Sequence, residues 1–367
     1  MQALRIYAGP KARAHLAANG LRPQDVGVIP GAAGGPKGLI LGPLDRFIFG
    51  QWLSQSTHTV HLIGASIGAW RMATACLDQS VAALQRLEHD YIHQHYDVPP
   101  GQKRPSAEQV SREFGHNLQA FYGGRIDEVL QHSRYRLHVV TSHGRHVLHR
   151  EHPVATALGY AGAYVTNAVS RRWLGAWLER VVFSTRGSVP RALADGDLPF
   201  ASDDFRTHWF DLTADNFMSA LQASCSIPFV LQAVHDIPGA PTGAYWDGGI
   251  TDYHLHLHYT PPSSSPIVLY PHFQQQVVPG WLDKAWRHRH HATAYLDHTV
   301  VLAPNPEWVR TLPNGKLPDR TDFTHYGMDL AARVRVWNAA VSAAQQLADE
   351  FAQWLDNGTP TEAVQPL

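Results

Sequence analysis

A serine that lies between two glycines has the residue types and spacing of a nucleophilic centre. The segment reads Gly64-Ala65-Ser66-Ile67-Gly68. The mostly apolar run over 58–63 predicts a buried strand before it, and the small and apolar residues over 69–77 predict a helix after it. A G-x-S-x-G motif at a strand-to-helix turn strains the serine backbone and exposes its hydroxyl, and its glycines leave room where strand and helix cross. The pattern therefore predicts that Ser66 is a nucleophile.

A glycine-rich loop nearer the N-terminus can supply the anion-binding groups that such a serine needs. The loop occupies residues 31–38, between a predicted strand over 26–30 and a predicted helix over 39–49. A loop in this position presents backbone N–H groups to an anion. We expect Gly34 and Gly35 to donate to the charged oxygen of a tetrahedral intermediate, in an oxyanion hole. A tight turn of small residues is the alternative interpretation.

The same loop does not match the common nucleotide-binding motifs. Ala33 occupies the first glycine position of G-x-G-x-x-G, and no acidic residue about 20 positions later completes a dinucleotide site. The spacing to Lys37, together with Gly38 where Ser or Thr is required, excludes a Walker loop. We therefore expect no cofactor.

Late in the chain, a predicted aromatic strand delivers an aspartate into a glycine turn. The segment reads Tyr245-Trp246-Asp247-Gly248-Gly249. An Asp-Gly pair by itself is ordinary turn chemistry. Asp247 is therefore a candidate site residue only when it is considered together with the glycine-rich loop and the serine motif.

In chain order, these three motifs resemble those of the patatin-like phospholipase family, which has a glycine-rich oxyanion loop, a G-x-S-x-G elbow and a D-G-[AG] motif. The small residues over 223–228, ahead of the aspartate, are also similar, and the resemblance spans about residues 26–252. It implies hydrolysis of lipid acyl esters by a Ser–Asp dyad, with Ser66 as nucleophile and Asp247 as its base. Gly34 and Gly35 would be the oxyanion donors.

The resemblance also assigns supporting positions in the three motifs. These are Lys37, Gly38, Gly64, Gly68, Gly248 and Gly249. Lys37 stands where the family usually has arginine, so a bidentate contact becomes a point-charge contact. Direct contact with a serine in a partly desolvated cleft would raise the pKa of the aspartate above its ordinary value of about 3.9, and so make it a stronger base.

Predicted strands alternate with predicted helices along the chain, which is typical of an α/β fold with a mainly parallel sheet. The resemblance implies a three-layer α/β/α sandwich. We expect residues 1–260 to form the catalytic core, with a short helical or irregular lead-in over 1–25. Residues 261–367 should form a C-terminal extension packed on the core in one domain, with extra strands over 267–270 and 299–302 and a long helix over 328–356. Packing on the sheet is the first interpretation of that helix, and a dimer or membrane contact is the second.

The composition of the chain limits the classes of partner and the cellular location that we expect. The chain has 367 residues and a formal net charge of −1, which gives no electrostatic reason to expect nucleic acid. Two cysteines imply no disulfide framework, and the chain shows neither a secretory signal nor an apolar stretch long enough to span a bilayer. We expect a cytoplasmic protein that contacts lipid or another ester substrate, with peripheral membrane contact. The sequence leaves the oligomeric state open.

Histidines and basic residues outside the motifs suggest weaker candidates. His254, His256 and His258 would share one face of a strand and could bind zinc, but a polar strand face is the preferred interpretation, and we expect no metal site. The run over 287–291, Arg-His-Arg-His-His, reads as a solvated basic patch that could touch an anionic interface.

Two alternative functions stay open from the sequence. A Ser-His-Asp triad of the ordinary α/β-hydrolase type would need a histidine after the aspartate, for which His298 and His325 are available. The other alternative is a binding or scaffold protein in which the altered glycine loop does not support turnover.

Overall fold

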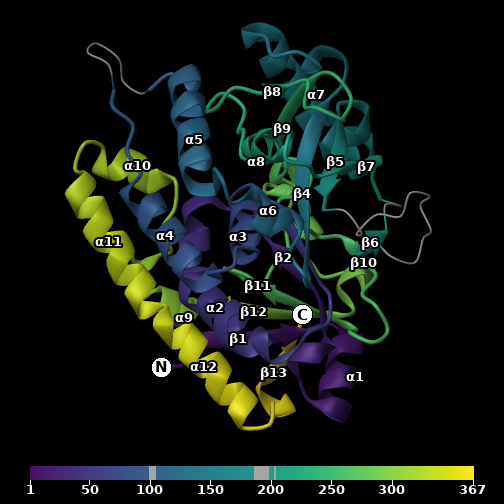
Figure 1. Ribbon diagram of the computed structural model, residues 1–367, viewed down its shortest axis with the longest axis vertical. Helices are drawn as coiled ribbons and strands as arrows, with labels where there is room; N and C mark the ends of the chain where they lie inside the picture. Colours follow the sequence, from purple (N-terminus) through teal and green to yellow (C-terminus); the bar gives the residue numbers. More distant parts are fainter. Residues whose placement is uncertain (99–104, 186–197, 202–203) are drawn as a thin grey trace.

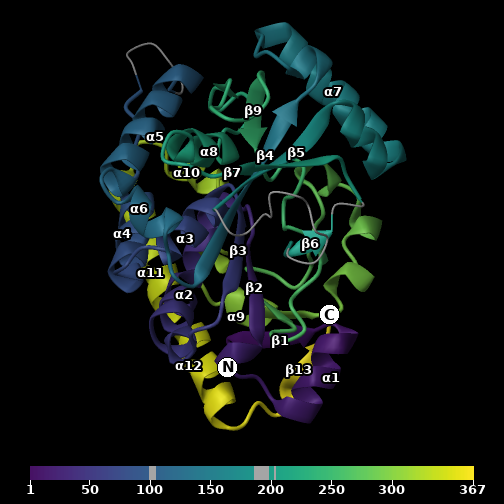
Figure 2. The same ribbon diagram turned by 45° about the vertical axis from the view of Figure 1, so that its right-hand side comes forward.

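A large, mostly parallel sheet forms the middle of the molecule, in a computed structural model that describes residues 1–98, 105–185, 198–201 and 204–367. Helices and shorter helical segments cover both faces, so the fold is the expected three-layer α/β/α sandwich (Figures 1 and 2). The strands of this sheet run in the order β13-β1-β12-β11-β2-β3-β4-β5-β7, and β9 and β8 continue it from β4. Their bounds are β1 Leu4–Ala8, β2 Val26–Gly31, β3 Val60–Ala65, β4 Tyr135–Gly144, β5 Leu178–Ser184, β7 Thr207–Asp211, β8 Val234–His235, β9 Ala244–Asp247, β11 Ile267–Pro271, β12 Thr299–Pro304 and β13 Val364–Pro366.

The central strands explain where the functional edge lies. β2, β3 and β4 pair in parallel, with Gly31 opposite Gly64 and Ala65 opposite Val140. The glycine-rich loop and Ser66 therefore leave adjacent strands at the same edge of the sheet. β9 runs antiparallel to β4 and pairs Asp247 with Thr141, which brings the aspartate to that edge from the opposite direction.

One face of the sheet is covered by α3, which packs on β2, β3 and β4, and by α2, α4, α11 and α12 outside or beside it (Figure 2). The helix bounds are α1 Pro10–Asn19, α2 Gly42–Phe47, α3 Ile67–Ala75, α4 Ser80–His93, α5 Ala107–Tyr122, α6 Ile126–Leu130, α7 Pro153–Val169, α8 Phe217–Ser224, α9 Pro306–Val309, α10 Thr321–Tyr326, α11 Leu330–Ala343 and α12 Gln345–Asp356. A separate pair of short strands joins β6 (Phe200–Ala201) to β10 (His258–Tyr259).

The C-terminal part is more than an addition packed on a core. The predicted strands over 267–270 and 299–302 are confirmed as β11 and β12, but both lie inside the central sheet, between β1 and β2. Strands from before and after the expected boundary near residue 260 therefore pair within one continuous sheet. The lead-in over 1–25 was predicted without a strand, which is wrong, because residues 4–8 form β1 between β12 and β13. Its partners in β12 and β13 lie about 290 to 360 positions later in the chain, so the local pattern could not reveal the pairing.

The long helix predicted over 328–356 is divided into α11 and α12. The N–H of Ala344 donates to the carbonyls of both Ala340 and Val341 at 3.1 Å, which tightens the turn at this buried residue. The two halves then pack on different neighbours, α11 on α4 and α12 on α2. Packing on the sheet, the first interpretation, describes α12, which contacts β1. The main contacts of α11 are instead with other helical segments, above all α4 and α10.

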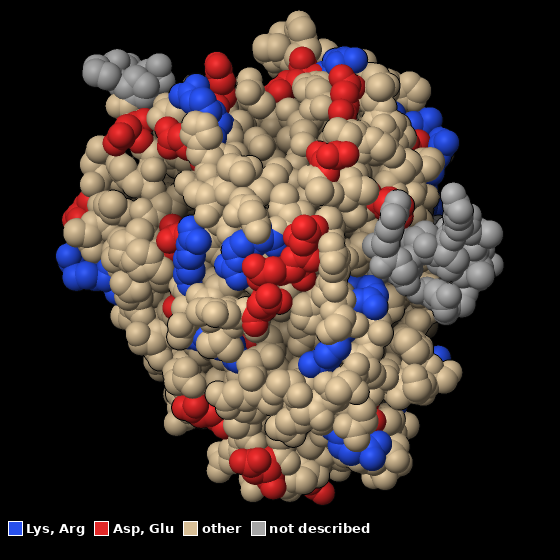
Figure 3. Space-filling view, viewed as in Figure 1, with Lys and Arg blue, Asp and Glu red and all other residues tan. Residues whose placement is uncertain are grey.

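The distribution of surface charge agrees with the nearly neutral net charge of the chain. Basic and acidic side chains are interspersed over the face shown in Figure 3, without a large patch of one sign. Within the described residues, no helix combines the length and apolar character needed to cross a bilayer.

Candidate active site

Ser66 occupies a sharp turn between β3 and α3. Its backbone is left-handed, with φ 56° and ψ −131°, which is a strained conformation for a residue other than glycine. A Cβ atom on Gly64 would lie 2.3 Å from Ala69 Cα, and one on Gly68 would lie 1.8 Å from the Gly31 carbonyl oxygen. Strand and helix therefore cross at a distance that only glycine allows, as the motif predicts.

The aspartate predicted from the sequence meets this serine. The Ser66 hydroxyl donates to Asp247 Oδ2 at 2.7 Å, across 181 positions of the chain. The other carboxylate oxygen, Oδ1, accepts the N–H of Gly249 at 2.7 Å. Ser66 is 4% exposed and Asp247 is 5% exposed, so the pair is largely withdrawn from water.

A second serine holds the two sides of this pair together. The N–H of Ser66 donates to Ser224 Oγ at 2.9 Å, and Ser224 Oγ donates to the Val140 carbonyl at 2.7 Å. The Ser224 carbonyl accepts the N–H of Gly248, next to Asp247. Sequence reasoning did not single out Ser224, although the small-residue segment over 223–228 marks its place.

The environment makes Asp247 an unusually strong base for a carboxylate. Burial raises its pKa from 3.8 to about 6, against the opposing effects of the Ser66 hydroxyl, Arg320, the Gly249 N–H and Lys284. A carboxylate with a pKa near 6 is ionised at neutral pH, yet it accepts a proton more readily than an ordinary aspartate does.

The glycine-rich loop lies beside the dyad. Ala33 is anchored by its N–H, which donates to the Tyr253 carbonyl at 2.9 Å. Gly34 lines the same cavity as Ser66 and Asp247, and Gly35 follows in a left-handed conformation with φ 58°. Among the residues that the structure describes, neither the Gly34 nor the Gly35 N–H donates to another group. These N–H groups are therefore unused by the fold itself.

The supporting glycines all pack around this centre. Gly38 lies beside Ile67, since a Cβ there would be 3.5 Å from that side chain. A Cβ on Gly248 would lie 2.1 Å from the Val140 carbonyl oxygen, and one on Gly249 would lie 2.7 Å from Ala33 Cβ. The structure thus brings the three sequence motifs into one place.

A cavity of about 190 Å³ opens in front of the dyad. Besides Ser66 and Asp247, three basic residues line it, namely Lys37, Lys284 and Arg320. The sequence drew attention to Lys37 alone. Lys284 and Arg320 come from the part of the chain beyond the motifs, and the turn-rich loop over 312–320 carries no pattern that would have identified Arg320.

The other sequence candidates lie elsewhere or are shaped differently. The three histidines expected on one strand face are not on one strand, because Leu255 adopts φ 48° and only His258 belongs to β10. His254 is buried against Phe273, and His256 Nε2 contacts Thr293 Oγ1. Within the described residues, no group of three or more His, Cys, Asp or Glu is arranged to hold a metal ion.

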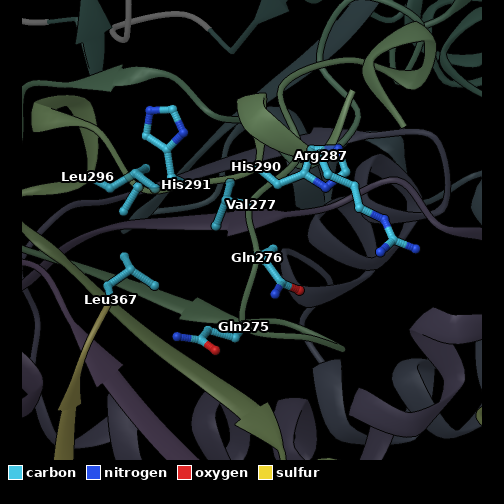
Figure 4. Close-up of a pocket in the computed structure, with 9 residues that line it drawn as sticks. Gln275, Gln276, Val277, Arg287, His290, His291, Leu296 and Leu367 are labelled. Atoms are coloured by element: carbon cyan, nitrogen blue, oxygen red, sulfur yellow. The ribbon is translucent and has the colours of Figure 1, made fainter. Parts of the chain in front are cut away.

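The basic run over 287–291 is only partly a solvated patch. Arg289 is tied to Asp283 Oδ1 at 2.8 Å. Arg287, His288 and His291 are exposed, as expected of a solvated patch. Arg287, His290 and His291 also line a cavity of about 610 Å³, away from the dyad, beside Leu296 and Leu367 (Figure 4).

The histidines available for a triad are not bonded to Ser66. His298 Nδ1 contacts the Pro266 carbonyl at 3.0 Å. His325 is exposed on α10. Within the described part of the chain, the group that accepts the Ser66 proton is the Asp247 carboxylate.

No model of a known protein family matches this chain, and a search of curated proteins finds no match either. The chemistry of the site therefore has to be argued from its own geometry.

Proposed function

We propose that this chain is a serine acyl hydrolase that cleaves carboxylic esters, with Ser66 as nucleophile and Asp247 as its base. The observation that carries the proposal is the 2.7 Å hydrogen bond from the Ser66 hydroxyl to a buried carboxylate at a strained strand-to-helix turn. A hydroxyl is a weak nucleophile until an adjacent base takes its proton, and this pair has the required contact.

The proposed reaction uses only groups of this chain, the ester and water. Ser66 Oγ attacks the ester carbonyl carbon while its proton passes to Asp247 Oδ2. Asp247 then returns that proton to the departing alkoxide, which leaves as an alcohol and gives an acyl-serine. Water, deprotonated by Asp247, attacks the acyl-serine, and the proton returns to Ser66 as the carboxylic acid is released.

The negative oxygen of each tetrahedral intermediate needs donors that are fixed beforehand, and losing one donor typically reduces the rate by about 10²–10³. The Gly34 N–H in the cavity wall, which donates to no group among the described residues, is our first candidate, with Gly35 next to it in the chain. The start of α3 directly after Ser66 adds the positive end of a helix dipole at the same point.

Lipid esters are the substrate class implied by the sequence resemblance, and one surface feature supports a lipid contact. The helix α7 carries no charged residue. Its Tyr164 stacks on Trp286 with 6.1 Å between the ring centres, and Trp286 follows the cavity residue Lys284 by two positions in the chain. α7 lies at the edge of the molecule (Figures 1 and 2), and several of its large apolar side chains are exposed. These are Val154, Leu158, Val165 and Val169, each more than 60% exposed. We propose a cytoplasmic enzyme that touches membranes through this helix.

An active-site-directed fluorophosphonate probe, which forms a covalent bond with an activated serine, tests the proposal. The protein should label at Ser66, and Ser66→Ala should abolish both labelling and turnover of a soluble ester. The exposed Ser54 provides a matched control, so Ser54→Ala should label normally. A folded protein that neither labels nor hydrolyses esters would support a binding or scaffold role instead. Loss of turnover in His298→Ala, with activity kept in Asp247→Asn, would support the triad.

A further inference from the structure

Three basic side chains line the cavity of the dyad. Lys37, Lys284 and Arg320 all line it, and within the described residues none of them forms an ion pair. Two carboxylates also line it, but both are held by other groups. Asp247 accepts from Ser66 and Gly249, and Asp319 is paired with Lys316 at 2.8 Å. Asp319 does act on Lys37 through space, since it raises the pKa that burial lowers there.

The fold holds these cations in place without neutralising them. Lys284 Nζ lies 3.9 Å from the centre of the Tyr253 ring and 5.5 Å from that of Trp281. Lys37 Nζ lies 5.4 Å from the centre of the Phe273 ring. Aromatic faces attract a cation but leave its positive charge available to an anion.

Arg320 reaches the same place from the loop before α10. A Cβ atom on Gly35 would lie 3.1 Å from Arg320 Nε and 3.6 Å from the Tyr91 hydroxyl. The guanidinium therefore lies directly beside the glycine loop that we propose as the oxyanion hole. Its planar fork suits two oxygens of a carboxylate or phosphate.

The three positive groups affect one another. Desolvation, together with Arg320 and Lys37, lowers the pKa of Lys284 to about 7, and Asp247 opposes this shift. Asp247 and Asp319 offset part of the repulsion among these like charges, but both are held by other groups, and a bound anion would relieve more of it.

We propose that this cluster is a substrate subsite for an anionic group, so that the preferred ester carries its own carboxylate or phosphate a few bonds from the scissile carbonyl. The inference rests on the proposed acyl hydrolase function and specifies its substrate class. The cavity of about 190 Å³ is smaller than the 300–1,000 Å³ typical of drug-sized ligands, so it suits a short acyl or alcohol portion with one charged group. Any longer chain of the substrate would lie outside it.

Binding can be measured without turnover. Isothermal titration calorimetry of the full chain with glutarate and with inorganic phosphate should detect at least one of these anions. Lys284→Gln and Arg320→Gln should each weaken that binding by about 10- to 100-fold, as expected for a charge-assisted contact. Lys11→Gln and Arg13→Gln remove exposed cations on α1 and should leave the binding unchanged. Lys284→Arg should retain most of it, which a mere packing defect at this position would not predict.

Two kinetic comparisons identify the source of the anion. The first compares the mono-p-nitrophenyl ester of glutarate with p-nitrophenyl butyrate, and the second compares dihexanoyl phosphatidic acid with dihexanoylglycerol. In at least one pair, the anionic ester should have the higher kcat/KM. The ratio of the two kcat/KM values should fall about 10-fold or more in Lys284→Gln and Arg320→Gln. Preference in the first pair indicates a soluble acid, and preference in the second indicates a lipid headgroup.

The two proposals fail in different ways. If neutral esters are hydrolysed by Ser66 but neither anion binds and neither pair shows a preference, the subsite is wrong and the hydrolase stands. If the anions bind through Lys284 and Arg320 but no ester is cleaved and Ser66 does not label, the subsite stands and the hydrolase is wrong.

Discussion

Replacing Asp247 with asparagine should make the protein less active and more stable at the same time. Raising the pKa of this carboxyl from 3.8 to about 6 means that its ionised form destabilises the folded state by about 3 kcal/mol at pH 7. The asparagine side chain is neutral and nearly the same size. Its amide would disturb the hydrogen bond with Ser66, at a cost of about 1 kcal/mol. We expect a net increase in the free energy of unfolding of about 2 kcal/mol at pH 7.

The sign of the pH dependence makes this prediction specific. The folded-state pKa lies above the unfolded one, so the destabilisation is fully present above about pH 6 and disappears as the pH falls towards 3.8. The advantage of Asp247→Asn should therefore shrink below pH 6 and be lost near pH 4. At pH 7 the variant should hydrolyse esters about 10²–10⁴-fold more slowly than the unaltered protein, since the general base is gone, and this difference should also shrink below pH 6 as Asp247 becomes protonated.

Urea unfolding followed by tryptophan fluorescence and far-UV circular dichroism, at pH 4, 5 and 7, measures the effect. Asp349→Asn, an exposed change on α12, is the matched control and should shift stability by less than about 0.5 kcal/mol. An Asp247→Asn variant that is less stable at pH 7, or whose advantage is independent of pH, would refute the assignment of a buried carboxylate base with a raised pKa.

Three further predictions concern the same centre. For a neutral ester, kcat/KM should fall to about a tenth of its plateau at pH 5, because a base with a pKa of about 6 is then mostly protonated. Arg320→Gln should shift this acidic decline in kcat/KM to higher pH, since Arg320 lowers the pKa of Asp247. Gly68→Ala should destabilise the fold by about 3 kcal/mol or more in thermal unfolding, because its Cβ would lie 1.8 Å from a backbone oxygen, whereas Gly175→Ala, with 3.8 Å to its nearest neighbour, should be close to neutral. Ser224→Ala should cost about 1–3 kcal/mol and reduce kcat, because the N–H at the turn loses its buried acceptor; unchanged kcat would show that this bridge does not position the nucleophile.

Short-range features of the site could be predicted from the sequence because they are decided within a few residues. The strained turn at Ser66 needs Gly64 and Gly68 at fixed spacing between a strand and a helix, and all of these lie within one local segment. The glycine loop after β2 has the same local character.

Asp247 is an intermediate case. Its type and its Gly-Gly turn are local, but on their own they do not distinguish a base from an ordinary turn. The order of the three motifs pointed to it, and the 2.7 Å contact with Ser66 then follows from the pairing of β9 with β4.

By itself, the sequence determined the α/β alternation, the strained serine and the small residues around it, because local periodicity and backbone conformation depend on near neighbours. Only the tertiary structure decided that β1 joins β12, that β11 and β12 lie inside the sheet, and that Lys284 and Arg320 reach the dyad. The physical reason is that pairing between distant strands and the convergence of distant side chains depend on long-range packing. A single lysine or arginine in a loop has no local sequence pattern that predicts such packing.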